Sequence, residues 1–144
     1  MIEVVNRQRK LQLDCKRWEA FAGKALKVVP GGNGDTGDVT IVFVSDRAMR
    51  EINRTWRGKR STTDVLSFPS DQDEFEKAAG LNLGDVVISA EQAARQAATN
   101  GLSLEAEIAQ LILHGLLHLC GYDHETDKGE MNRLEVRLRR RLGI

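Results

Sequence analysis

The three histidines of this chain fall within eleven residues, in the run His114-Gly-Leu-Leu-His118-Leu-Cys-Gly-Tyr-Asp-His124, and none lies elsewhere. Because His114 and His118 are four residues apart, a helix would place their Cβ atoms about 5–6 Å apart on one face. Gly121 permits a sharp turn after that helix, so His124 can return as a third ligand. A single histidine on an apolar helix is usually a core residue, but three at ligand spacing predict a metal site.

Three imidazoles and one open position are typical of catalytic zinc, whereas structural zinc sites usually close with a fourth Cys or His. We therefore predict one zinc ion per chain on His114, His118 and His124, although nickel or copper would also bind imidazoles. Such an ion lowers the pKa of a bound water toward about 7, or polarises a phosphoryl oxygen directly. Cys120 should point away from the metal and is predicted to be a buried small residue.

The histidine run also matches the extended zincin pattern H-E-x-x-H-x-x-G-x-x-H, with one substitution. Gly115 occupies the position of the peptidase's general-base Glu, which argues against a peptidase. The base is left unassigned between metal-bound hydroxide, Asp123 and no side chain at all. Asp123 has two further interpretations, an acceptor that orients a histidine or a residue that shapes the turn. Ser67 has no adjacent base and is not predicted to be a nucleophile.

Length and composition favour a soluble globular protein of one domain, residues 1–144. The chain is 41% hydrophobic and 29% charged, which is ordinary for a globular protein. It has no apolar run of membrane-spanning length and no secretory leader, so a cytoplasmic location is expected. Two cysteines make no disulfide framework, which agrees with a reducing compartment.

Periodicity and capping residues predict an α/β fold with element order β-α-β-α-β-β-α-α-α. The expected strands cover residues 2–5, 38–44, 65–68 and 84–89. The expected helices cover about 14–28, 46–56, 90–100, 104–120 and 127–141, with a further helical turn at 75–79. The early β-α-β units favour parallel pairing, while an acidic connection between the last two strands allows antiparallel pairing. A mixed four-stranded sheet with about five helices is therefore predicted.

The formal net charge is zero, yet basic residues gather in one segment. Arginines recur at helix spacing along one face of the expected 46–56 helix and just beyond it, and such a stripe can follow a phosphate backbone. These are Arg47, Arg50, Arg54 and Arg57. A solvated charged face is the simpler explanation for most of them. Arg57, at the helix end, is the exception, because a guanidinium can bind a phosphate bidentately and stabilise its charge.

Three segments together resemble the YbeY family of bacterial endoribonucleases. They are the segment from Trp56 through the run Thr-Asp-Val-Leu-Ser-Phe-Pro at 63–69, the Leu-Gly-Asp-Val-Val-Ile run at 83–88, and the histidine run. The resemblance spans about 53–124. Trp56 stands where the family usually has Tyr, and Arg60 and Thr62 where it usually has Asp and Pro, so roles that depend on those two positions are not carried over.

The resemblance implies a metal-dependent, single-strand-specific ribonuclease acting in 16S rRNA 3′-end maturation and ribosome quality control. It implies single-stranded RNA and the ribosome or ribosomal proteins as partners, with neither DNA nor membrane. It also implies that the three histidines are the metal ligands and that Arg57 is functionally important. We therefore expect Arg57 and His114 to be essential for catalysis.

Two other functions remain open on the sequence alone. One is a metal-dependent hydrolase of another substrate, which would need neither the basic face nor RNA. The other is a non-catalytic ribosome-assembly factor with a structural metal, which would unfold when the metal is removed.

Overall fold

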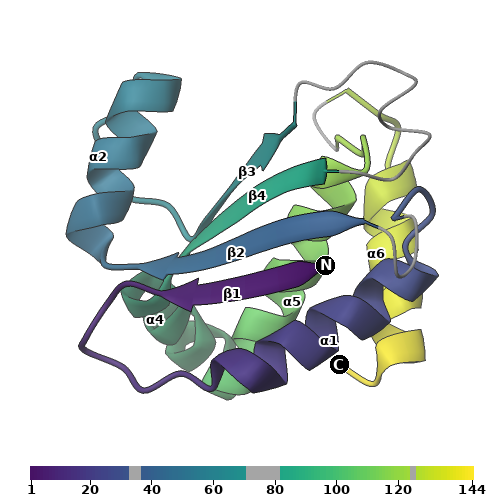
Figure 1. The fold of residues 1–144 in the computed structure, drawn as a ribbon, viewed down its shortest axis with the longest axis horizontal. Coiled ribbons are helices and arrows are strands. Elements are labelled where there is room, and N and C mark those ends of the chain that lie inside the picture. Colours follow the sequence, from purple (N-terminus) through teal and green to yellow (C-terminus); the bar gives the residue numbers. More distant parts are fainter. Residues whose placement is uncertain (33–36, 71–81, 124–125) are drawn as a thin grey trace.

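A mixed four-stranded sheet forms the frame of the molecule (Figure 1). The computed structural model describes residues 1–32, 37–70, 82–123 and 126–144. The strands are β1 (Ile2–Asn6), β2 (Asp38–Val44), β3 (Val65–Pro69) and β4 (Asn82–Ser89), in the spatial order β1-β2-β4-β3. β1, β2 and β4 are parallel, and β3 pairs antiparallel with β4 at one edge. The predicted mixed sheet is confirmed.

Five helices accompany the sheet in the described part of the chain, and the predicted element order is confirmed. They are α1 (Cys15–Val28), α2 (Asp46–Arg57), α4 (Ala90–Asn100), α5 (Leu104–Leu119) and α6 (Glu130–Leu142). Three of them begin at a predicted serine cap, whose hydroxyl accepts a backbone N–H three residues later at 3.1–3.2 Å. The turn predicted at 75–79 lies outside the described residues. No helix of the described ranges is long and apolar enough to cross a membrane.

The two faces of the sheet are covered unequally. Residues that alternate along β2 and β4, such as Ile41 and Val86, join α1, α5 and α6 in the larger core. The opposite face carries a smaller cluster in which Met49 of α2 packs against Leu66 and Val87. Since β3 is an edge strand with one face toward each cluster, it lies between α5 and the end of α2 (Figure 1).

The start of α6 differs from the prediction. The sequence indicated a start at Asp127 with Glu130 as its capping partner, but the helix begins at Glu130. Gly129 adopts a positive φ of 96°, so the chain is not yet helical before it. Asp127 still accepts a helix N–H, from Met131 at 2.8 Å. Asp127 was therefore correctly identified as a carboxylate that accepts a helix N–H, but the helix was predicted to begin at Asp127 itself and begins at Glu130.

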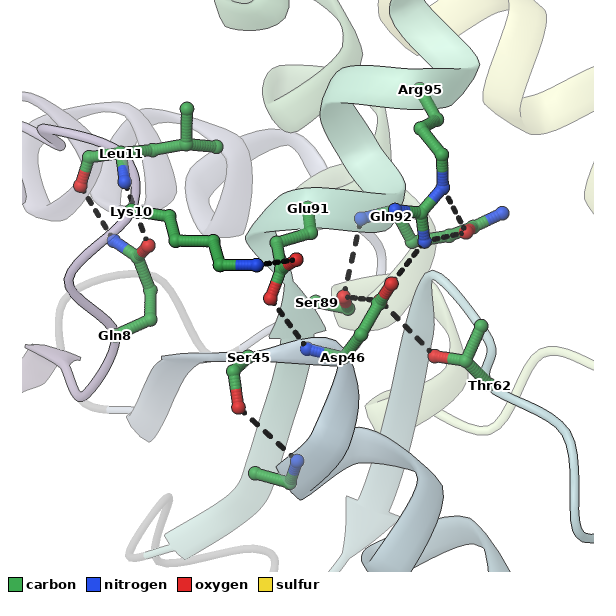
Figure 2. Close-up of polar contacts among 11 residues, drawn as sticks. Gln8, Lys10, Leu11, Ser45, Asp46, Thr62, Ser89, Glu91, Gln92 and Arg95 are labelled. Carbon is green, nitrogen blue, oxygen red and sulfur yellow. Dashed lines mark hydrogen bonds and ion pairs between the residues drawn. The ribbon is translucent and has the colours of Figure 1, made fainter.

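A buried carboxylate joins the first turn of α2 to the end of β4 (Figure 2). Asp46 accepts hydrogen bonds from the Ser89 hydroxyl at 2.5 Å and the Thr62 hydroxyl at 3.2 Å, and it pairs with Arg95 of α4. Burial alone would raise the pKa of Asp46, but the bonds from Ser89 and Arg95, and the charge of Arg95, bring it below its ordinary value. The carboxylate therefore fixes α2 relative to the sheet.

Acid should weaken the fold through Asp46. Its pKa is lower in the folded than in the unfolded chain, so its contribution is present above the unfolded value of about 3.9 and is lost as pH falls through the folded value. We expect Asp46→Asn to cost about 1–2 kcal/mol of unfolding free energy at neutral pH, since Arg95 is half exposed and solvent screens it. Urea unfolding between about pH 7 and pH 3 measures this. The variant should lose less stability on acidification than the wild type and than Glu3→Gln, a control on the exposed face of β1. Parallel curves for all three proteins would contradict the assignment.

Candidate active site

His114 and His118 lie one turn apart on α5 and direct their rings toward each other, as the spacing predicts. Their Nε2 atoms are 3.2 Å apart, and the ring centroids are separated by 4.7 Å at an interplanar angle of 76°. Two imidazole nitrogens on one tetrahedral zinc, each at 2.0–2.1 Å, would be roughly 3.3–3.4 Å apart. The two rings therefore fit a shared cation with almost no movement.

The third predicted ligand, His124, lies outside the described residues. Within the described ranges no three His, Cys, Asp or Glu side chains form a metal-binding group. The complete ligand set, and zinc itself, therefore stay predictions.

Glu135 of α6 is a site residue that our sequence reasoning missed. Its Oε1 lies 2.9 Å from Nδ1 of His114, and its side chain is only 9% exposed. When Nδ1–H donates to this carboxylate, the lone pair of His114 is on Nε2, the atom that faces His118. A signal was present in the sequence: Glu135 falls on the apolar face of α6 beside Leu134 and Leu138, where a carboxylate needs a partner.

The surroundings of Glu135 favour its charged form. Burial alone would raise the pKa of this carboxyl, but the hydrogen bond and charge of His114 and the nearby Arg139 and His118 bring it below its ordinary value. Arg139, one turn further along α6, has a guanidinium nitrogen 3.7 Å from Glu135 Oε2. Glu135 therefore remains an acceptor for His114 and fixes the ring's orientation, as carboxylates do behind metal-bound histidines.

Replacing Glu135 with Gln should weaken metal binding about 10- to 100-fold, because the amide holds the ring less firmly and lowers its basicity. Competition with a chromophoric chelator at fixed pH measures this affinity. Glu130→Gln, an exposed position on the same helix, serves as the control and should bind like wild type. Equal affinities for all three proteins would show that Glu135 does not position a ligand.

Gly115 has no room for a side chain. A Cβ atom there would lie 2.6 Å from Cγ1 of Val86 and 3.3 Å from the Ser67 hydroxyl, because α5 packs closely against β3 and β4. The Ser67 hydroxyl donates to the Gly115 carbonyl at 3.2 Å. The sheet thus fills the space that a peptidase's general-base Glu would need, and the Ser67 proton is already engaged.

A pocket of about 390 Å³ brings together the predicted site residues Arg57, His114 and His118. Its lining includes Arg57, Asp64, Ser67, His114, His118 and Asp123. Arg57 is the last residue of α2, and Gly58 then turns the chain with a φ of 67°. Arg57 therefore lines the pocket from the α2 side of β3, and the histidine pair lines it from the α5 side.

Two carboxylates line this pocket, and they are held differently. Asp64 accepts the N–H of Val65 at 2.8 Å and the hydroxyl of Thr63 at 3.3 Å. With its amide nitrogen turned inward, Gln96 of α4 also donates to Asp64 at 2.9 Å and to Glu107 at 3.0 Å. These bonds make Asp64 a fixed structural acceptor.

Of the two roles left open for Asp123, the structure supports the one in the turn, whereas a contact that orients a histidine stays a prediction. Its side chain lines the pocket, and its backbone carbonyl accepts the N–H of Thr126 at 3.3 Å, which shapes the turn after α5. Cys120, which was predicted to be buried, is only partly buried and packs against the larger core. Burial raises the pKa of its thiol to about 11, so the thiol is protonated at neutral pH.

The family model described as Endoribonuclease YbeY matches residues 3–143. The chain belongs to the YbeY family. The resemblance seen over 53–124 thus extends along nearly the whole sequence.

Relatives of this chain agree with the family assignment. The endoribonuclease YbeY of Campylobacter fetus is 45% identical over 107 residues, covering 74% of this chain and 76% of its own. That of Nautilia profundicola is 43% identical, covering 74% and 73%, and that of Sinorhizobium medicae is 41% identical, covering 78% and 68%. The solution structure of TM1509 from Thermotoga maritima matches with a TM-score of 0.63 over 99% of this chain and 89% of its own. At 24% identity this likeness supports the fold alone.

Proposed function

We propose that this YbeY protein is a single-strand-specific, metal-dependent endoribonuclease that acts in 16S rRNA 3′-end maturation and ribosome quality control in the cytoplasm. Membership of a family named for endoribonuclease activity supports RNA as the substrate. The observation that carries the proposal is a single pocket that is lined both by Arg57 and by the two converging histidines.

His114 and His118 would hold the cation, with His124 as third ligand, and zinc or nickel suits such an imidazole set. When bound, the cation supplies Lewis acidity toward a water or a phosphoryl oxygen. Glu135 keeps Nε2 of His114 available by accepting Nδ1–H. Arg57 binds the phosphate of the scissile nucleotide and stabilises the negative charge that develops on it. Asp123 lines the same pocket and is the side-chain candidate for the base that accepts a proton.

The substrate range separates this proposal from its alternatives. Metal-replete protein should cleave a short single-stranded RNA and leave the same RNA largely intact when it is annealed to its complement. Single-stranded DNA of the same sequence and a casein peptide mixture are the comparison substrates. Cleavage of peptide without RNA cleavage would indicate a hydrolase of another class, despite the closed space at Gly115.

The assembly-factor alternative makes a different prediction about stability. A structural metal would lower the melting temperature sharply on chelation, without turnover when metal is returned. We expect a modest shift instead, because the larger core forms from α1, α5, α6 and the sheet without using the histidine rings. Loss of the folded state on chelation, together with no RNA cleavage, would overturn the proposal.

A further inference from the structure

Trp56 is the exposed aromatic side chain among the described residues. It is 70% exposed near the end of α2, whereas Trp18 is 3% exposed in the larger core. Isolated exposed apolar residues are common on soluble proteins and need no explanation by themselves. Trp56 differs from such isolated residues because it contacts Phe68 and lies in a basic segment.

Phe68 holds the indole in a defined orientation. The two ring centroids are 6.0 Å apart with an interplanar angle of 69°, an edge-to-face contact. Such a contact occupies one part of the indole and leaves the rest open, in agreement with its exposure. Trp56 is therefore a supported ring that presents open surface to the solvent.

Positive charge is concentrated in the segment that carries this ring. Exposed basic side chains occupy the end of α2 and the loop that follows, and of these Arg54 is paired with Glu51 at 2.7 Å. They are Arg50, Arg54, Arg57, Lys59 and Arg60. An exposed aromatic ring among cations is the combination with which proteins bind single-stranded nucleic acid, the cations along the backbone and the ring against a base.

The ring and the active-site pocket lie on the two sides of the same edge strand. Phe68 of β3 packs with the smaller cluster beneath α2, whereas its neighbour Ser67 bonds to α5 and lines the pocket. Trp56 likewise precedes Arg57, which lines the pocket from the α2 side. A single-stranded nucleic acid with one phosphate at Arg57 would thus bring a neighbouring base to Trp56, the preceding residue.

We infer that Trp56 is a base-stacking subsite for single-stranded nucleic acid, beside the phosphate-binding Arg57. The inference rests on the proposed function for the class of ligand. It adds a binding contact outside the catalytic pocket that accepts any base, because every base has a stacking face.

Tryptophan fluorescence tests this directly, since the chain has two tryptophans and only Trp56 is exposed. The probe is a 2′-O-methyl oligouridine of about ten nucleotides, and a gel run after each titration verifies that it is intact. The probe should quench the emission of the wild type and leave that of Trp56→Phe, whose remaining tryptophan is buried, unchanged. Binding followed in parallel by fluorescence anisotropy of a labelled oligonucleotide should persist in Trp56→Phe and weaken roughly 5- to 100-fold in Trp56→Ala.

Kinetics provide the second measurement. Trp56→Ala should raise KM for single-stranded RNA by a similar factor with kcat nearly unchanged, and Trp56→Phe should restore most of the loss. Binding without quenching, or an unchanged KM in Trp56→Ala, would overturn the inference while leaving the ribonuclease proposal intact. If the wild type neither binds nor cleaves RNA, both fail together.

Discussion

A chain carrying His114→Ala and His118→Ala together should be purified without bound metal, whereas the wild type should retain about one zinc ion per chain. The two Nε2 atoms at 3.2 Å supply two of the three predicted ligands, and a single remaining imidazole cannot hold the ion. The folded state should survive, because both rings are only partly buried and alanine suits a helix interior. Metal content by mass spectrometry, with circular dichroism to verify folding, measures the outcome.

Cys120→Ala is the matched control for this loss. It removes the thiol at this end of α5, and it should retain full metal content because the Cys120 side chain packs against the larger core. Zinc retained by the double histidine variant, or lost from Cys120→Ala, would show that the ligand set has been misassigned.

Arg57→Ala should lower kcat/KM for single-stranded RNA about 10²- to 10³-fold at unchanged metal content. The guanidinium lines the same pocket as the histidines, and because it offers no lone pair it is not a metal ligand. Arg57→Lys should recover only part of the activity, since a point charge cannot bind a phosphate bidentately.

The control for Arg57 is Arg137→Ala, which removes an exposed arginine from α6, away from the pocket. It should cleave like wild type. Normal cleavage by Arg57→Ala would remove Arg57 from the mechanism, and an equal loss in Arg137→Ala would reduce its role to general charge attraction.

Local patterns in the sequence predicted most of the fold. The serine caps of α2, α4 and α5 and the alternation along β2 depend on neighbouring residues, and each is where it was expected. The convergence of His114 and His118 follows from helix geometry in the same way. The start of α6 was misplaced because Gly129 delays the helix after the capping Asp127, and spacing alone does not reveal that.

Features that depend on contacts between elements were not predictable. Glu135 and His114 are 21 residues apart in the chain, and they meet only because α6 packs against α5. The tight fit at Gly115 depends on how closely α5 approaches Val86. The sequence therefore showed that the peptidase Glu is absent, but not that a side chain at this position would have no room. Likewise, Arg57 was suspected from its position, but its place in the histidine pocket required the fold.

The most direct test of the central claim is cleavage of single-stranded RNA by metal-replete wild type beside the His114→Ala/His118→Ala variant from the same preparation. We predict cleavage by the wild type and none by the variant, which would establish a ribonuclease that depends on these histidines and exclude a contaminating nuclease. Equal cleavage by both proteins would contradict the account, because the activity would then come from a contaminant or from chemistry that does not use this site.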